Sequence, residues 1–358
     1  MTDLIGDELA SVLVAEISRG FPLGDLLSHA LSDEPPDAGA WARLFETGLS
    51  DVAVAAALDG FGLGADVLAT LFRGGGSVLL PLAAQEQAIV LAPVLGALAD
   101  GSARVAELLA GVRAGSVVGG GGGVVDAAGL RVDDESVVLD GVGVWTGPGA
   151  SVVAVVGPEV TVVLDLPPAP VVSAPSVALD AGQGLRLLTG PVARVDALVL
   201  EGAEARRIWQ RWQLALLAHV LGVADAVLDQ ATGYAKERSQ FGRPIGSFQA
   251  VSHPLADAHV SVTAGESALA RLAALLDAPA DAAAGVDEVL AGLACWLPAK
   301  ARLVCEQAMQ VHGGIGFTWE HGLHLFYRRA LTIQALLGGR VGAARRVQGV
   351  HGAAEDRS

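Results

Sequence analysis

Apolar residues recur about every 3.6 positions through the first part of the chain, from residue 3 to about residue 110. Three segments interrupt this rhythm: "SDEPPDAG" at 32–39, "LDGFGLGADV" at 58–67 and "RGGGS" at 73–77. Proline, glycine and aspartate are typical of helix ends and of the turns between helices. The pattern therefore predicts an N-terminal helical domain, residues 1–112.

From about residue 115 to residue 200 the pattern changes to short runs rich in valine, separated by glycine, proline and aspartate. The runs "SVVLDGVGVW" (136–145), "SVVAVVG" (151–157) and "VTVVLDL" (160–166) have the length and composition of strands. They predict a small middle β domain, residues 113–200. We expect "GGGGG" at 119–123 to be a flexible turn, since no Lys-Ser or Lys-Thr pair follows it and no helix opens after it, as a phosphate-binding loop would require.

Helical periodicity returns after residue 203 and predicts four long helices, at 204–236, 247–277, 287–311 and 319–336. Long helices joined by short loops pack as an antiparallel bundle. We therefore expect a C-terminal four-helix bundle within residues 201–358. Because helices and strands are segregated along the chain, the predicted fold class is α+β, mostly α, with separate layers and no parallel α/β sheet.

Composition narrows the environment and the partners. The chain is 52% hydrophobic, but Gln85, Glu86, Gln87, His219 and Asp225 interrupt its longest apolar runs, so we expect no membrane span. The net charge of −16, without any run of lysine or arginine, argues against nucleic acid as a partner. The first residues carry acids where a signal peptide carries bases, which makes the cytoplasm the expected location.

The stretch "KERSQFGRPIGSFQ", residues 236–249, separates two of the predicted bundle helices. We expect one helix to end near Arg238, a turn at Gly242 and Pro244, and a new helix starting near Ser247 as its N-cap. Arg238, Gln240 and Phe241 then lie at a helix end, where a guanidinium can bind a phosphate and an aromatic ring can cover a flat apolar group. An ordinary capped turn with a surface ion pair is the simpler alternative.

This stretch closely resembles the "ER-x-QFG-x-PI-x-x-FQ" signature of the acyl-CoA dehydrogenase superfamily, whose members carry FAD. A second segment, "EQAMQVHGGIGFTWEH" at 306–321, resembles the superfamily's "Q-x-x-GG-x-G-(Y/F)-T-x-E". The resemblance implies the acyl-CoA dehydrogenase fold, whose order of helical domain, β domain and four-helix bundle matches the order predicted above. It also implies that six residues contact an FAD that lies mostly in a neighbouring subunit: Arg238, Gln240, Phe241, Gln310, Gly313 and Gly314.

The residues that carry out the chemistry in this superfamily have no counterpart here. In most members a glutamate that follows the bundle removes the α-proton of the acyl-CoA thioester, and Leu337 occupies that position in this chain. Some members place the base on the first bundle helix instead, where Trp212 stands. The loop that holds the flavin ring, "T-E-P-x-A-G-S-D" in the family, corresponds to "GSVVGGGGGVV" at 115–125. The resemblance therefore implies no catalytic residue in this chain.

The chain keeps the residues that contact a neighbour's FAD, but it has no counterpart of the base or of the flavin-ring loop. This difference suggests that the chain is one subunit of a pair of unlike subunits. The segment "HGGIGFTWEH" followed by "LHLFYRRA" resembles the short chains of α2β2 heterotetrameric enzymes of actinobacterial steroid side-chain β-oxidation. The resemblance implies a bulky sterol-derived acyl-CoA substrate, a second acyl-CoA dehydrogenase-like subunit that supplies the base, and an electron-transfer flavoprotein as electron acceptor.

Two alternatives stay open. The first is a self-sufficient homomeric enzyme with a displaced base, for which the candidates are Glu320, Glu237 and Asp225. The second is a flavin-free structural homologue. No metal site is expected, although His312, His321 and His324 fall close together in the sequence, because a third ligand at a suitable spacing is not evident.

Overall fold

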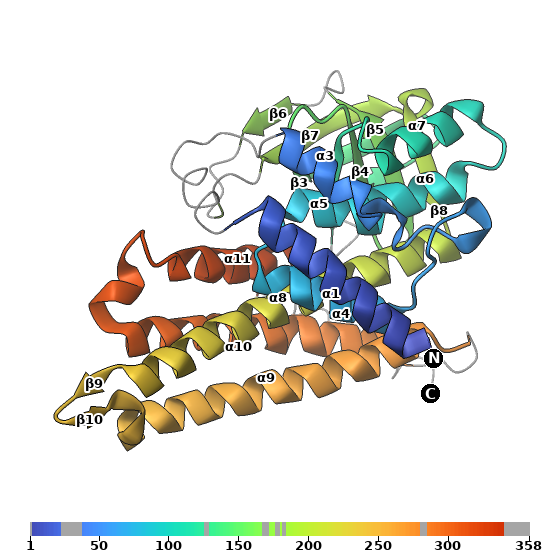
Figure 1. Ribbon diagram of the computed structural model, residues 1–358. Helices are drawn as coiled ribbons and strands as arrows, with labels where there is room; N and C mark the ends of the chain where they lie inside the picture. The colour runs from blue at the N-terminus through green and yellow to red at the C-terminus, as the bar shows by residue number, and fades with distance from the viewer. Residues whose placement is uncertain are drawn as a thin grey trace, which may run out of the picture.

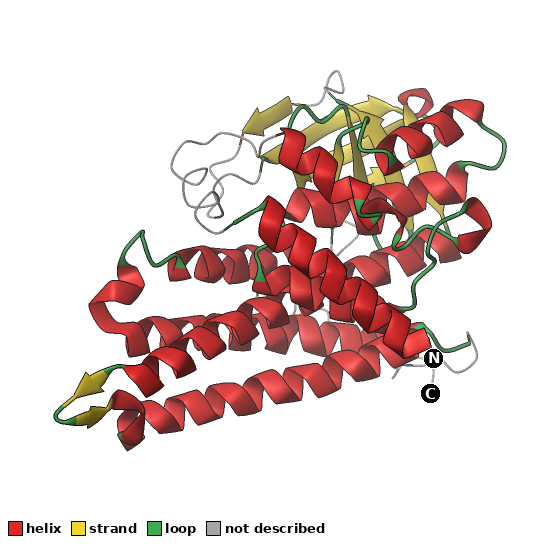
Figure 2. Ribbon diagram, in the orientation of Figure 1, coloured by secondary structure: helices red, strands yellow, loops and turns green. Residues whose placement is uncertain are grey.

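The computed structural model describes residues 2–22, 38–124, 129–166, 172–175, 180, 184–279 and 285–339. A mixed β-sheet lies at one end of the molecule and a bundle of long helices at the other, and short helices from the N-terminal part lie over both (Figures 1 and 2). Helices and strands are thus segregated as the sequence predicts, and the predicted fold class is confirmed.

The short helices contribute to the same apolar core as the bundle helices, and this core encloses Trp41, Phe72 and Trp212. The helix that starts at Leu82 is continuous but changes its hydrogen-bonding pattern to that of a π-helix over Gln87–Leu91. The described elements of this part are α1 (Thr2–Gly20), α3 (Ala38–Glu46), η1 (Leu49–Asp51), η2 (Ala56–Leu58), α4 (Ala65–Ser77), α5 (Leu82–Glu86), η3 (Gln87–Leu91), α6 (Ala92–Leu98) and α7 (Ala103–Arg113).

Helix α4 crosses the first bundle helix, α8 (Ala203–Glu237), at backbone contact. A Cβ atom built on Gly76 would lie 1.9 Å from the carbonyl oxygen of His219, and one built on Gly222 would lie 1.8 Å from that of Arg73. Only glycine fits at such a crossing, and this explains why Gly76 and Gly222 are glycines.

We expect Gly222→Ala to lower the free energy of unfolding by about 2–3 kcal/mol, because the added methyl group must push α4 away from α8. Gly233→Ala is a matched control on the same helix, since no heavy atom lies within 4 Å of a Cβ built there. Alanine is the better helix former, so this control should stabilise the protein by up to about 1 kcal/mol. Urea unfolding measures both changes, and equal effects of the two substitutions would contradict the close crossing.

The sheet has the strand order β6-β7-β3-β1-β4-β5-β8, with β2 paired to β3 beside this path. Strand β1 runs parallel to β4 and antiparallel to β3, so the sheet is mixed. A second apolar core, made of valines and leucines from several strands, lies in this part of the molecule. The strands are β1 (Gly119–Gly123), β2 (Leu130–Val132), β3 (Ser136–Thr146), β4 (Val152–Val156), β5 (Val160–Asp165), β6 (Val172–Pro175), β7 (Leu185–Ala193) and β8 (Ala197–Glu201), with the 3-10 turn η4 (Arg194–Asp196) before β8.

The prediction of a flexible turn at residues 119–123 is wrong, because these five glycines form the buried strand β1. The reason is close packing on both sides of the backbone. A Cβ built on Gly120 would lie 1.9 Å from the carbonyl oxygen of Trp145 on the neighbouring strand, and one built on Gly119 would lie 2.2 Å from the side chain of Leu91. Glycine in a strand interior marks such close approach of other groups to the backbone.

The C-terminal bundle consists of α8, α9 (Gln249–Leu276), α10 (Val286–His312) and α11 (Leu323–Leu336), close to the predicted ranges. Between them lie β9 (Ser239–Gln240), β10 (Arg243–Pro244), η5 (Ile245–Ser247) and η6 (Gly313–Phe317). Ser247 is not the N-cap of α9: Phe248 takes that position, and the Ser247 hydroxyl donates to the carbonyl of Pro244. Helix α8 is long and apolar enough to cross a membrane, but 78% of its most apolar window is covered by the rest of the protein, as in a core helix.

Candidate functional site

The two segments that carry the predicted flavin contacts emerge from the same end of the bundle (Figure 1). Tyr234, in the last turn of α8, stacks on His312, the last residue of α10, with 4.6 Å between ring centroids. His312 in turn meets the ring of His321 at 4.5 Å. The three rings hold the β9–β10 hairpin and the η6 turn at one end of the bundle, which brings the predicted residues of both motifs to one region.

The β9–β10 hairpin presents an aromatic ring to solvent at its tip. Phe241 and Gly242 form its two-residue turn, and both have positive φ, +52° and +79°. This matches the turn type that suits tight hairpins, but a bulky residue such as phenylalanine adopts positive φ only at a cost in free energy. The Phe241 side chain is 92% exposed and therefore gains little from burial. Strain without burial indicates that the ring is placed for a contact outside this chain.

Arg238 and Gln240 are exposed at the base of the hairpin. Arg238 is the C-cap of α8: its N–H donates to the carbonyl of Tyr234, and its carbonyl accepts from the N–H of Ile245. Within the described part of the chain, its guanidinium has no carboxylate partner. An exposed, uncompensated guanidinium beside an exposed ring fits the diphosphate and the flat adenine of an FAD, so these residues agree with the cofactor that the resemblance implies.

The η6 turn offers open backbone. Gly313 has φ +65° and ψ −139°, a conformation that favours glycine, and no heavy atom lies within 4 Å of a Cβ built on Gly313 or Gly314. Gln310 is exposed one turn before them. Ile315, Phe317 and Trp319 expose large apolar side chains directly after the glycines. A concentration of exposed apolar side chains beside bare backbone indicates a surface that another subunit covers.

Both positions at which the family resemblance would place a base are closed to solvent here. Leu337 follows the last turn of α11 and is fully buried. Trp212 lies in the middle of the core, where its indole N–H donates to Oε1 of Glu86 at 3.0 Å. Neither side chain can accept a proton from a carbon acid, so the described site contains no base at either place.

The segment that corresponds to the flavin-ring loop is also covered by the chain itself. A Cβ built on Gly123 would lie 2.6 Å from the Trp212 ring, and one built on Gly121 would lie 3.3 Å from Cβ of Glu86. The side chains of α5 and α8 therefore rest directly on the backbone of β1. A flavin ring cannot lie between surfaces that are already in van der Waals contact.

Glu86 is a buried carboxyl that the sequence does not identify as a functional candidate. Burial, opposed in part by the Trp212 hydrogen bond, raises the pKa of Glu86 from 4.5 to about 8. Its second oxygen has no hydrogen-bond partner among the described residues. The acid is therefore held in its neutral form around neutral pH. The signal for it is the polar triplet Gln85, Glu86 and Gln87 within an otherwise apolar helix, because consecutive polar residues there must find partners inside the core.

A second buried polar group joins four segments of the chain around Arg329. Its guanidinium pairs with Asp180 and donates from Nη1 to the carbonyl of Leu80 at 2.7 Å and to Nε2 of His219 at 2.8 Å. His219 Nδ1 lies 2.8 Å from Oε1 of Gln85. Since Nε2 accepts from arginine, the ring proton is on Nδ1 and is donated to Gln85. Burial, and then the charge of Arg329, lower the pKa of His219 well below 6.5, so this histidine stays neutral.

The three carboxylates considered as displaced bases lie away from such buried positions. Asp225 forms an ion pair with Arg73, which also pairs with Glu266. Glu237 and Glu320 are exposed on the surface. In the part of the chain that the structure describes, no three His, Cys, Asp or Glu side chains are placed to hold a metal ion.

Comparison with known proteins agrees with this architecture. The family described as "Acyl-CoA dehydrogenase, C-terminal domain" matches residues 209–341. Acyl-CoA dehydrogenase IpdE2 of Mycolicibacterium smegmatis is 38% identical over 126 residues, which cover 35% of this chain and 37% of the relative. Acyl-CoA dehydrogenase IpdE2 of Mycobacterium tuberculosis is 39% identical over 115 residues, 32% of this chain and 33% of the relative. The similarity thus spans about a third of the length of these relatives.

A solved structure described as the Tcur3481-Tcur3483 steroid ACAD G363A variant superposes with a TM-score of 0.81, covering 99% of this chain and 100% of that chain at 25% identity. The ChsE4-ChsE5 complex from Mycobacterium tuberculosis gives a TM-score of 0.76 at 21% identity, over 96% of each chain. Residues 209–341 thus match the acyl-CoA dehydrogenase C-terminal domain family, and nearly the whole chain has the acyl-CoA dehydrogenase fold.

Proposed function

We propose that this chain is one subunit of a heteromeric, FAD-dependent acyl-CoA dehydrogenase, and that an unlike partner supplies the catalytic base and the pocket for the flavin ring. One observation carries the proposal. Trp212 fills a base position and closes the face of β1, whereas Arg238 and Phe241 are exposed at the other end of α8. The chain thus keeps the residues that would contact an FAD in a neighbouring subunit. At the two family base positions it has no base, and its own side chains cover the place of the flavin ring.

In this proposal the chain contributes binding and no proton transfer. Arg238 would hold the diphosphate through its guanidinium, Gln240 would add a polar contact, and Phe241 would cover a flat apolar part of the cofactor. Gly313 and Gly314 allow the cofactor to approach the backbone, with Gln310 beside them. FAD, when bound between the subunits, supplies the acceptor for the hydride from the β-carbon of the acyl group.

The substrate that we propose is the CoA thioester of a sterol side-chain acid, oxidised between its α- and β-carbons. Support comes from the steroid ACAD with which this fold superposes over 99% of the chain, and from the two-component descriptions of both structural neighbours. An electron-transfer flavoprotein as electron acceptor and a cytoplasmic location complete the proposal, as expectations from the family resemblance.

Co-expression tests the proposal. The chain is purified alone and together with an acyl-CoA dehydrogenase-like chain encoded beside it, and flavin absorbance and its bleaching by a steroid-acid CoA thioester are measured, with butyryl-CoA as comparison. We expect a colourless single chain and a yellow complex that the steroid thioester reduces. A yellow, active single chain would establish a self-sufficient enzyme, and a colourless complex would leave a structural role.

Within the complex, Arg238→Ala should weaken FAD retention by about 10- to 100-fold, the loss of one charge-assisted hydrogen bond to the diphosphate. Arg104→Ala is the matched control, because Arg104 is an exposed arginine that pairs with Asp165 near the sheet. Equal flavin content in the Arg238→Ala and control complexes would refute the role assigned to Arg238.

A further inference from the structure

A cavity of about 330 Å³ lies between the η2 segment, helix α6 and the first turns of α8. Its volume is within the range of small-molecule sites. Arg211, at the edge of the cavity, precedes Arg238 by 27 positions on α8, which places it about 40 Å from the hairpin along the helix axis. The cavity is therefore separate from the proposed flavin surface.

The lining of the cavity combines an apolar wall with one charged edge. Leu58, Ile89, Pro93, Ala97 and Ile208 supply apolar surface from four elements, η2, η3, α6 and α8. The charged residues all come from α8: Glu204, Arg207 and Arg211. Residues three and four apart lie on the same side of a helix, so these three charges form a single row.

The two arginines of this row are paired unequally. Arg207 pairs with Glu204 at 2.8 Å. Arg211 forms a long ion pair, 3.7 Å, with Oδ1 of Asp277, whose other oxygen accepts the backbone N–H of Ala65 at 2.7 Å. Among the described residues, the buried Nε of Arg211 has no hydrogen-bond partner. A guanidinium that is four-fifths buried, with one long ion pair and a buried Nε that no described residue satisfies, is costly, and an added anion would offset that cost.

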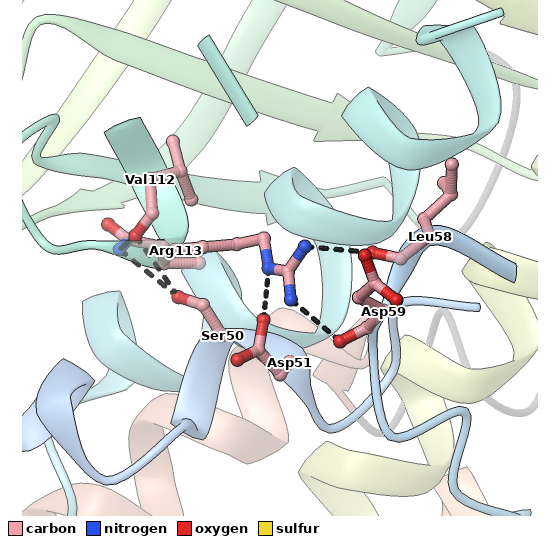
Figure 3. A network of polar contacts seen from close by, with 7 residues as sticks. Ser50, Asp51, Leu58, Asp59, Val112 and Arg113 are labelled. Atoms are coloured by element: carbon pink, nitrogen blue, oxygen red, sulfur yellow. Dashed lines mark hydrogen bonds and ion pairs between the residues drawn. The ribbon is translucent and has the colours of Figure 1, made fainter. Parts of the chain in front are cut away.

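The part of the cavity lining that η2 supplies is held by side-chain hydrogen bonds from α7. Arg113 of α7 donates from Nη1 to the carbonyl of Leu58 at 2.8 Å and from Nη2 to that of Asp59 at 2.7 Å, while its Nε pairs with Asp51 (Figure 3). These contacts hold η2, and with it Leu58, at the edge of the cavity. A cavity with a preformed wall binds a ligand without first ordering a loop.

We propose that this cavity binds a small amphipathic anion, a carboxylate with a short apolar chain. The carboxylate lies against Arg207 and Arg211, and the chain lies along Ile89, Pro93 and Ile208. Arginine suits this task because its planar fork matches the two oxygens of a carboxylate. The proposal is independent of flavin and of any partner, since every residue that it uses belongs to this chain.

The test uses calorimetric titration of the whole purified chain with hexanoate and, separately, with hexan-1-ol. We expect saturable hexanoate binding, at least tenfold weaker binding of the alcohol, and weakening of the hexanoate affinity by added sodium chloride. Equal affinities for the acid and the alcohol would overturn the proposal, because the arginines would then contribute nothing.

Two kinds of variant make the test specific to this cavity. Ala97→Phe fills it from an exposed position on α6, where folding tolerates a larger side chain, and should reduce hexanoate affinity at least tenfold. Arg207→Gln should weaken it severalfold, and Arg104→Ala, remote from the cavity, should leave it unchanged. Unaltered hexanoate binding by a folded Ala97→Phe protein would overturn the proposal.

Discussion

Glu86→Gln should remove a large pH dependence from the stability of this protein. Burial raises the pKa of Glu86 from 4.5 to about 8, so the folded chain keeps a proton that the unfolded chain releases above pH 4.5. Where the folded state binds more protons, the free energy of unfolding falls as the pH rises. One pKa unit corresponds to about 1.4 kcal/mol, so this carboxyl costs the wild type about 3 kcal/mol by pH 7.

The free energy of unfolding falls with rising pH because the core accommodates Glu86 in its neutral form. The stability that Glu86 contributes is present in full below pH 4.5, decreases through the neutral range and is gone above about pH 8. Glutamine has almost the same shape and can accept the Trp212 N–H, but it has no proton to lose. The Glu86→Gln variant should therefore keep the packing of the core and lose the pH dependence of stability that Glu86 causes.

The measurement is urea unfolding of both proteins between pH 5.5 and 8.5. We expect the wild type to lose about 1.4 kcal/mol per pH unit relative to Glu86→Gln until the pH nears 8, and little beyond it. Glu107→Gln, an exposed glutamate of α7, is the control and should leave the wild-type profile unchanged. Parallel profiles for the wild type and Glu86→Gln would show that Glu86 is already ionised in the folded protein.

Hydrophobic periodicity predicted the helices of the bundle well because tertiary packing agrees with local pattern there. The predicted helix at 204–236 is α8, Ala203–Glu237, and the one at 287–311 is α10, Val286–His312. The helix predicted from residue 319 begins only at Leu323, because Gly322 takes a left-handed conformation at its N-cap. Boundaries depend on such single-residue conformations, which periodicity does not encode.

The glycine strand could not be predicted, since its stability comes from neighbours distant in sequence. Five consecutive glycines have poor strand propensity and no side chains to show alternation. Their place in the sheet is set by Trp145 and Gly143 on β3, and by Leu91 and Trp212 above them. Contacts with residues distant in sequence therefore determine strand β1, and the local sequence pattern does not show these contacts.

The exposed half of the candidate site was predictable and the buried half was not. Arg238 and Phe241 belong to a contiguous motif, which the fold places at one end of α8. Glu86 and Trp212 are 126 positions apart and meet only when α5 packs on α8. The sequence marks Trp212 as a missing base, but only the structure shows that a neutral carboxyl lies beside it.

Arg329→Met should destabilise the protein more than any surface substitution, by about 3–5 kcal/mol, because it removes one partner of a buried ion pair. Arg329 and Asp180 are both almost fully buried. Methionine fills a similar volume but leaves the carboxylate of Asp180, the carbonyl of Leu80 and Nε2 of His219 without their donor. Each buried acceptor left unsatisfied adds to the cost.

The charge of Asp180 should account for a separable part of that loss. Asp180→Asn keeps an acceptor for Arg329 and should cost less than Arg329→Met. In the double variant Arg329→Met/Asp180→Asn no uncompensated carboxylate remains, so it should be more stable than Arg329→Met alone by about 1–2 kcal/mol. Urea unfolding of the wild type and of the three variants measures this difference and also gives the coupling energy between the two residues.

The neighbouring residue supplies the control for position on the helix. Arg328 lies on the same helix, one residue earlier, and its guanidinium is 5.2 Å from the centroid of the Trp319 ring at the partly exposed end of the bundle. Arg328→Met should therefore change stability by less than about 1 kcal/mol. If Arg329→Met costs no more than Arg328→Met, the Arg329 group does not hold the four segments together. A large difference between adjacent arginines would locate the stabilising contact in the buried group itself, since the two substitutions are chemically identical and differ only in what the side chain touches.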